Sequence, residues 1–242
     1  MNFIIKRHFF LYIIFFWNCE SQQNTEYLSN LNLNESSDKV TLHSFIALGD
    51  SYTIGESVSK KDRWPVQLVD SINKTSSKIN SLKIFAKTGW TTTELLEGIE
   101  NDTLEISYDW ASLMIGVNNQ YRGLNINNFK NEFDILLRKA ISFCGGKKKR
   151  VFVLSIPDWG VTPFASSRNY IKIKKEIDAF NEVIKKVCME SNIRYFDITE
   201  ISREASYNRT LIADDGLHPS RLMYKKWIKI IIPYILKENE KN

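Results

Sequence analysis

Histidine and cysteine are scarce in this sequence, with three residues of each type among 242. His8 lies in the N-terminal leader, and His43 precedes the first predicted strand, on the order of 20 Å of extended chain from that strand's far end. His218 is therefore the histidine that can act there. The three cysteines form no cluster, and a zinc site needs several such ligands together. We therefore expect no metal site and no other cofactor.

A strong excess of charge and a long N-terminal apolar run are also missing. The chain has 33 basic and 28 acidic residues, and the excess falls to three once Lys6 and Arg7 of the leader are left out. That excess is too small and too scattered for a nucleic-acid-binding surface, and the basic run at residues 147–150 is interpreted as a solvated loop. With 43% hydrophobic and 25% charged residues, the chain has the composition of a globular domain, which excludes a disordered, collagen-like or coiled-coil protein.

Residues 1–18 predict an export signal. Basic residues precede nine apolar residues at 9–17, fewer than the roughly 20 that a membrane-spanning helix needs. Cys19 follows, and this arrangement resembles a bacterial lipoprotein signal, in which the cysteine becomes the lipidated first residue, although Asn18 is larger than the residue usual before it. We expect a lipid anchor at Cys19, a flexible tether over residues 19–42, and a location in the periplasm or at the cell surface. An ordinary signal peptide with an incidental cysteine is the alternative.

Short apolar strands alternate with amphipathic helices from Ser44 onward. Strands are expected at residues 44–48, 82–86, 110–115, 151–156 and 195–198, and helices at 64–69, 92–99, 129–144, 173–187 and 220–233, where Pro233 kinks or ends the last helix. This order predicts an α/β fold, a three-layer α/β/α sandwich around a five-stranded parallel sheet. One domain is expected over residues 43–238, followed by a polar tail at 239–242. Cys144 and Cys188 could pair or remain buried thiols, and the oligomeric state is left open.

Four short polar blocks fall where such a sheet places its functional residues, at the carboxyl ends of strands. They read GDSYTIG at 49–55, KTGWTT at 87–92, GVNN at 116–119 and DDGLHP at 214–219. Since a metal is not expected, a hydroxyl nucleophile with a histidine base is the chemistry that these blocks favour. Ser51 by itself would be an ordinary helix cap, and the last block by itself would be a turn before a helix.

Together, the four blocks resemble the GDSL esterases and lipases, also called SGNH hydrolases, over roughly residues 44–236. The four marker residues of that family fall on Ser51, Gly89, Asn118 and His218, and its aspartate falls on Asp215. The resemblance implies a flavodoxin-like SGNH hydrolase fold. The third block departs from the family pattern because Asn119 stands where an aspartate is common, which puts the local hydrogen bonding in question.

The resemblance also implies a role for each marker residue. Ser51 is the expected nucleophile, His218 its base, and Asp215 the residue that orients the imidazole. The oxyanion hole would take donors from the backbone of Ser51 and Gly89 and from the amide of Asn118. Asp50 is interpreted as a structural residue that fixes the loop through backbone hydrogen bonds.

Aromatic and basic side chains near the strand ends suggest a substrate-binding rim. Trp90, Tyr121 and Arg122 are the predicted substrate-binding residues, although packing around the rim would explain the aromatic ones equally well.

The predicted function is an exported serine esterase that hydrolyses carboxylic esters of small molecules, lipids or glycans through an acyl-enzyme. The alternatives are a carbohydrate O-deacetylase with the same catalytic residues and a catalytically silent surface binding module.

Overall fold

A computed structural model of the chain describes residues 42–104 and 107–240. The chain divides into two units, residues 1–39 and 40–242, and the described residues belong to the second. The predicted signal, Cys19 and nearly all of the predicted tether lie outside the described residues. Among the helices that the structure describes, none has the length and apolar character needed to cross a membrane.

Five parallel strands form one sheet in the order β2-β1-β3-β4-β5. They are β1 (Leu42–Gly49), β2 (Lys78–Ala86), β3 (Trp110–Met114), β4 (Val151–Leu154) and β5 (Arg194–Phe196). Every residue of β3 and β4 is buried, as expected for central strands that are covered on both faces. The five-stranded parallel sheet is therefore confirmed.

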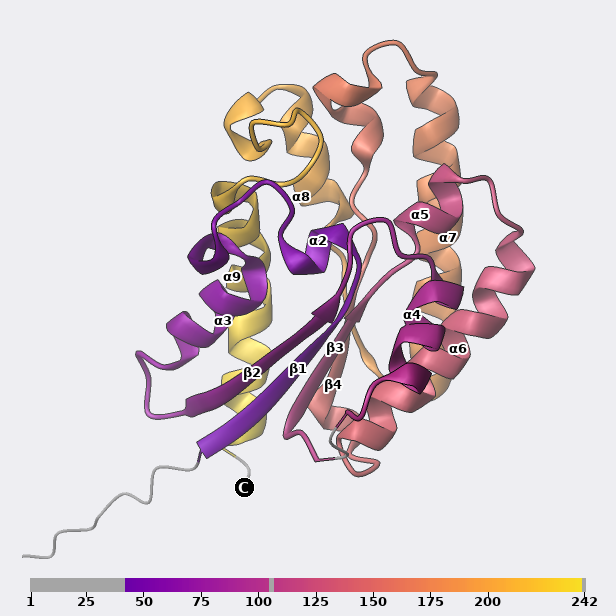
Figure 1. The fold of residues 1–242 in the computed structure, drawn as a ribbon. Helices are drawn as coiled ribbons and strands as arrows, with labels where there is room; N and C mark the ends of the chain where they lie inside the picture. The colour runs from indigo at the N-terminus through magenta and orange to yellow at the C-terminus, as the bar shows by residue number, and fades with distance from the viewer. Residues whose placement is uncertain (1–41, 105–106, 241–242) are drawn as a thin grey trace, which may run out of the picture. The chain divides into compact units, whose positions relative to one another are not determined.

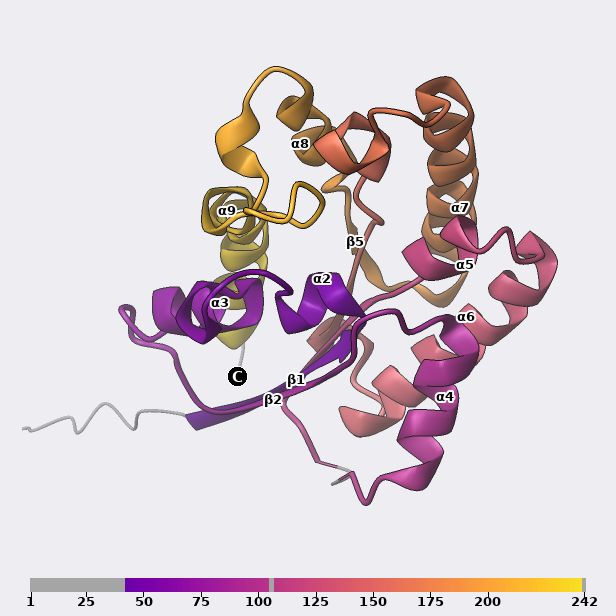
Figure 2. The ribbon, with the colours of Figure 1, turned by 45° about the horizontal axis from the view of Figure 1, so that its top comes forward.

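Helices cover both faces of the sheet (Figures 1 and 2). The long ones are α3 (Trp64–Ile72), α4 (Thr92–Asn101), α6 (Ile126–Phe143), α7 (Tyr170–Ser191) and α9 (Arg221–Asn239). Figure 1 shows α3 and α9 on one face and α4, α6 and α7 on the other, which confirms the three-layer sandwich. The helices α3 and α4, which precede and follow β2 in the chain, lie on opposite faces of the sheet (Figure 1). The connections that leave β1 and β3 therefore run to opposite sides of the point between these two neighbouring strands. That divergence is the switch point at which open α/β sheets place their sites.

The last helix is longer than predicted. It continues through Pro233 to Asn239, because apolar residues on both sides of the proline, Ile231 and Ile235, are buried and hold the helix against the sheet. Of the two effects predicted for Pro233, a kink or the end of the helix, the second is wrong. Asn239 also differs from the expected polar tail, since its side-chain oxygen accepts hydrogen bonds from the Trp110 indole, at 3.2 Å, and from Arg150.

Cys144 and Cys188 are separate, buried thiols in this structure. Burial raises the pKa of each thiol to about 12, so both remain protonated at neutral pH. The question that their spacing left open is thereby answered in favour of two core residues.

Candidate active site

Ser51 opens a four-residue helix directly beyond the sheet. β1 ends at Gly49, and α2 (Ser51–Ile54) begins after Asp50, whose carboxylate accepts the Tyr52 N–H at 3.0 Å. Burial raises the pKa of Asp50 to about 7, against the opposing effect of this hydrogen bond. The carbonyl of Tyr52 accepts the Tyr224 hydroxyl at 3.0 Å, which ties α2 to α9. Asp50 therefore has the structural role expected for it, and Ser51 lies at the carboxyl edge of β1.

Asp215 and His218 form a close pair in the loop before α9. Asp215 Oδ2 lies 2.5 Å from His218 Nδ1, and Asp215 Oδ1 accepts the backbone N–H groups of Leu217 and His218, both at 2.9 Å. Burial would raise the pKa of Asp215, but hydrogen bonds from Ser57, His218 and the two backbone groups outweigh it and lower the pKa to about 2. The carboxylate is therefore ionised at neutral pH, and its contact with Nδ1 leaves Nε2 as the nitrogen able to accept a proton.

The loop after β2 brings Gly89 to the same edge. Gly89 has φ +85°, a left-handed conformation that other residues adopt at a cost. A β-carbon built there would have Arg122, 3.8 Å away, as its nearest neighbour, so the space in front of this residue is open. Glycine at this position suits the backbone conformation and leaves the space in front of its α-carbon open.

A second short helix, α5 (Val117–Tyr121), follows β3, and side chains from it and from the residue after it hold the Gly89 loop and the start of α4. Asn118 donates from Nδ2 to the carbonyl of Trp90 at 2.9 Å, which leaves its second amide hydrogen for another acceptor. Asn119 Oδ1 accepts the Thr92 N–H at 3.1 Å, and Arg122, just past the helix, donates from Nη2 to the Gly89 carbonyl at 2.6 Å. The Asn118 amide is thus fixed beside the Gly89 backbone.

The unusual Asn119 fits its surroundings. Its Nδ2 donates to the Thr92 hydroxyl at 2.7 Å, and that hydroxyl gives its own hydrogen to Glu132. An aspartate could not donate to the hydroxyl and would add a second carboxylate beside Glu132. The departure from the family pattern therefore has a local explanation in Glu132.

Ser51, Gly89, Asn118 and His218 line one cavity of about 210 Å³. Its other lining residues are Tyr52, Thr88, Val117, Tyr121, Trp159, Phe164 and Leu217. His218 is 8% exposed and packs against the ring of Tyr52, with centroids 5.5 Å apart. The structure thus brings the predicted nucleophile, base and oxyanion donors to a single, mainly apolar cavity.

Three aromatic side chains form one wall of this cavity. The rings of Tyr121 and Trp159 lie 5.3 Å apart, and those of Trp159 and Phe164 lie 6.1 Å apart. Trp159 is nearly buried, whereas Tyr121 and Phe164 are 46% and 42% exposed, so the wall continues from the cavity to the surface. Arg168 lies over both exposed rings, 5.8 and 5.9 Å from their centroids.

Of the three predicted substrate-binding residues, Tyr121 lines the cavity, and the other two are not among its lining residues. Trp90 packs on Phe85 and covers Gly98, where a β-carbon would come within 2.7 Å of the indole. Arg122 is engaged with the Gly89 carbonyl and, at 3.3 Å, with Glu94 Oε1. These contacts make Arg122 a positioning residue for the Gly89 loop.

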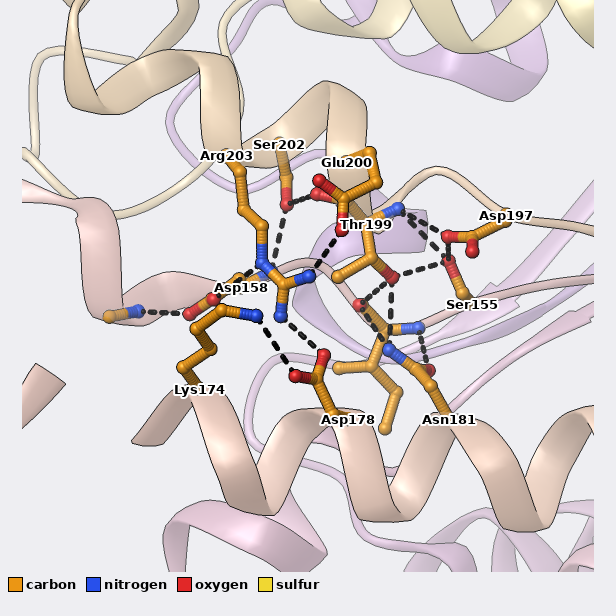
Figure 3. A network of polar contacts seen from close by, with 12 residues as sticks. Ser155, Asp158, Lys174, Asp178, Asn181, Asp197, Thr199, Glu200, Ser202 and Arg203 are labelled. Carbon is orange, nitrogen blue, oxygen red and sulfur yellow. Dashed lines mark hydrogen bonds and ion pairs between the residues drawn. The ribbon is translucent and has the colours of Figure 1, made fainter. Parts of the chain in front are cut away.

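A polar network around Asp158 and Arg203 fixes the segment that follows β4 (Figure 3). Arg203, in α8 (Thr199–Arg203), donates to Asp158 at 2.9 Å and also bonds Asp178 and Glu200. Burial would lower the pKa of Arg203, but its three carboxylate partners raise it, so the guanidinium stays charged.

Contacts of Asn181 and of the Trp159 indole also fix the position of the aromatic wall. Asn181 bonds both the N–H and the carbonyl of Ile156, at 2.7 and 3.0 Å, and the Trp159 indole donates to Gln120 at 2.7 Å. The wall position of Trp159 is therefore set by long-range polar contacts from α5, α7 and α8. The sequence carries no local signal of these contacts.

A larger hollow of about 870 Å³ lies near the start of β4 and β5, away from these residues. The basic run 147–150 and Arg194 line it, and none of the predicted site residues does. Within the described ranges, no three His, Cys, Asp or Glu side chains gather in a way that could hold a metal ion.

Replacing Arg122 by alanine tests its assigned position. Because Nη2 orients the Gly89 carbonyl, we expect kcat for an ester substrate to fall about tenfold with little change in KM. Arg138→Ala is the control, since Arg138 makes an exposed ion pair with Asp134, and both residues belong to α6. Steady-state kinetics would contradict the assignment if kcat stayed unchanged while KM rose for negatively charged esters, because that result indicates direct contact with substrate.

The fold and the site together define a class, a parallel α/β domain with a hydroxyl, imidazole and carboxylate set at its switch point. Residues 47–226 match the model of the GDSL-like Lipase/Acylhydrolase family, which is most of the chain. The chain belongs to this family, and the resemblance found from the four blocks is confirmed.

Solved structures share the fold at low sequence identity. A structure of TesA aligns with TM-score 0.63 and 16% identity over 79% of this chain and 97% of that one. An acetylxylan esterase, Axe2 from Geobacillus stearothermophilus, gives 0.60 and 17% over 81% and 93%, and a lipase/acylhydrolase from Enterococcus faecalis gives 0.60 and 19% over 80% and 95%. No curated protein sequence matches the chain significantly.

Proposed function

We propose that this protein is a serine esterase that hydrolyses carboxylic esters through an acyl-enzyme on Ser51. The observation that carries the proposal is the Asp215–His218 contact at 2.5 Å, with the imidazole lining the same cavity as Ser51, Gly89 and Asn118. Membership of a lipase/acylhydrolase family supports it.

The first half of the reaction acylates the enzyme. Ser51 Oγ attacks the ester carbonyl carbon while His218 Nε2 takes the hydroxyl proton, and ionised Asp215 stabilises the imidazolium through Nδ1. The carbonyl oxygen becomes an oxyanion that receives hydrogen bonds from the Ser51 and Gly89 N–H groups and the second amide hydrogen of Asn118. The intermediate then expels the alcohol, which takes its proton from His218.

Water completes the cycle. His218, neutral again, accepts a proton from a water molecule that attacks the acyl carbon. The second tetrahedral intermediate then releases the carboxylic acid as Ser51 Oγ leaves and takes the proton back from His218. The same donors stabilise both oxyanions, so one set of residues serves both halves.

The size of the cavity favours short acyl groups. Its 210 Å³ is below the roughly 300–1,000 Å³ of pockets that enclose drug-sized ligands. A panel of p-nitrophenyl esters from acetate to palmitate should therefore give the highest kcat/KM at the short end. A fluorophosphonate probe should label the protein, and wild-type protein that neither reacts with the probe nor hydrolyses any ester would refute the proposal in favour of a silent binding module.

A carbohydrate O-deacetylase is the second candidate. The aromatic wall of Tyr121, Trp159 and Phe164 continues to the surface, as a platform for a sugar ring would, and one structural neighbour is an acetylxylan esterase. Acetate release from acetylated xylan, compared with hydrolysis of a lysophospholipid, distinguishes this substrate class from a lipid one.

The activity should rise from acid to neutral pH, because a histidine can act as the base only in its neutral form. Only neutral His218 can accept the Ser51 proton, whereas Asp215, with its pKa lowered to about 2, stays ionised throughout this range. The rise should therefore follow a single ionisation, measurable in kcat/KM for p-nitrophenyl acetate corrected for spontaneous hydrolysis. A profile that is flat from pH 5 to 9 would contradict a histidine base.

We also propose that the enzyme is exported and anchored through lipidated Cys19, in the periplasm or at the cell surface. The position of Cys19 after the apolar run supports this, and so does the polar stretch of residues that follows, which would span roughly 25 Å as a flexible coil. Wild-type protein made in a bacterium should incorporate labelled palmitate and sediment with membranes, and Cys19→Ala should do neither. Unlabelled wild-type protein in the soluble periplasmic fraction would indicate an ordinary signal peptide.

A further inference from the structure

Ser57 links the segment that carries Ser51 to the loop that carries His218. Its hydroxyl donates to Asp215 Oδ2 at 2.7 Å, and the same oxygen contacts His218 Nδ1 at 2.5 Å. The N–H groups of Leu217 and His218, which belong to the Asp215 loop itself, donate instead to Oδ1 of this carboxylate. Ser57 therefore reaches the reactive side of the carboxylate from a different part of the chain.

The backbone of Ser57 has a left-handed conformation that costs a non-glycine residue energy. Ser57 has φ +63°, and within the described ranges the one other non-glycine residue with positive φ is Asn192, which caps the C-terminus of α7 as asparagine often does. Serine has no such preference for the left-handed region. The hydrogen bond to Asp215 accounts for a serine at this position.

The neighbouring residue makes a parallel contact on the other side of the site. Glu56 accepts a hydrogen bond from the hydroxyl of Thr88, which lines the cavity next to Gly89. Two consecutive residues after α2 thus hold the Asp215 loop and the Gly89 loop. Ser57 itself is exposed and is not among the residues that line the cavity.

We propose that Ser57 is a positioning residue for catalysis, whose hydroxyl orients Asp215 Oδ2 toward His218 Nδ1 and takes up part of the carboxylate's charge. The reaction that it assists is the proposed ester hydrolysis, so this inference rests on the proposed function. Without the hydroxyl, Asp215 has one fewer constraint on its orientation, and more of its negative charge acts on the imidazolium.

Two variants separate the hydroxyl from the backbone strain. Ser57→Gly removes both, and Ser57→Ala removes the hydroxyl and retains the strain, so Ser57→Gly should have the higher melting temperature. Both should lower kcat about tenfold and leave KM within twofold, because Asp215 loses the bond that orients it toward His218, a hydrogen bond to a charged group is worth about that much, and Ser57 does not line the cavity. Ser59→Ala is the matched control. Ser59 lies two residues after Ser57, and its hydroxyl makes a similar 2.6 Å hydrogen bond to Asp62.

The acid limb of kcat/KM supplies a readout that a purely structural role would not move. It should shift to higher pH in both Ser57 variants, because the unshielded carboxylate favours the charged imidazole. An NMR titration of the His218 ring should shift in the same direction without any substrate. The ring contacts Tyr52, which interacts electrostatically with Asp50, Asp158 and Asp215, and the variants leave all of these groups in place.

The outcomes separate the two proposals. If Ser57→Gly keeps wild-type kcat and an unshifted titration while Ser57→Ala is impaired, Ser57 serves the backbone alone and the inference is overturned. If both variants match wild type, it is overturned as well. If wild-type protein hydrolyses no ester, the proposed function fails, and the His218 titration still decides whether Ser57 acts on the Asp215–His218 pair.

Discussion

Ser51→Ala should abolish ester hydrolysis and leave the fold intact. Removing the nucleophile of a Ser-His-Asp enzyme lowers kcat on the order of 10⁶-fold, because the remaining groups cannot form an acyl-enzyme. The helix that Ser51 opens is capped by Asp50, through its bond to the Tyr52 N–H, and this cap survives the substitution. The melting temperature should therefore stay close to that of the wild type, and fluorophosphonate labelling should disappear.

Thr53→Val is a matched control for this test. Thr53 lies two residues further along α2, is fully buried, and its hydroxyl has no hydrogen-bond partner. Exchange of that hydroxyl for a methyl group removes a buried polar atom from the same helix without touching the cavity, so activity should be retained. If Ser51→Ala kept measurable turnover and labelling, the nucleophile would have to be another residue.

The sheet and its layers could be predicted because their signals are local. The strand 151–154 is apolar throughout, the strand 110–114 is apolar except for Ser112, and the helices around them repeat apolar residues at helical spacing. The edge strand β2 begins at Lys78 rather than at the predicted Leu82, because the exposed residues Asn80 and Ser81 interrupt the apolar pattern at its start. The helices α2, α5 and α8 are too short to show a period.

The candidate site could be predicted as far as its residues follow strand ends. Ser51, Gly89 and Asn118 each come soon after a strand, and parallel strands bring their carboxyl ends to one edge. The contact of Ser57 with Asp215 spans 158 residues of sequence and depends on how two loops fold against each other. The position of Arg122 at the Gly89 carbonyl is a contact of the same kind, because an arginine in a loop has the same sequence signal whether it binds substrate or backbone.

Asn118→Ala should lower kcat by about 10²–10³-fold, with a smaller effect on KM. The Nδ2 of Asn118 has two hydrogens, and the Trp90 carbonyl at 2.9 Å accepts one of them, so the amide is already oriented before substrate arrives. The second amide hydrogen forms its strongest bond when the substrate oxygen carries negative charge. Loss of this hydrogen bond therefore affects the transition state more than substrate binding. Asn118→Asp should be at least as inactive, because its carboxylate opposes the oxyanion.

Asn125→Ala separates this effect from a general loosening of the region. Asn125 caps α6, accepts the N–H groups of Asn127 and Asn128 at 2.8 and 3.3 Å, and does not line the cavity. Its loss should cost about 1 kcal/mol of stability and leave kcat unchanged. Steady-state kinetics and thermal unfolding of the three variants decide the matter. If Asn118→Ala kept kcat within threefold of wild type, the oxyanion would be stabilised by the Ser51 and Gly89 backbone alone, and the side chain of Asn118 would serve only to hold the Trp90 carbonyl.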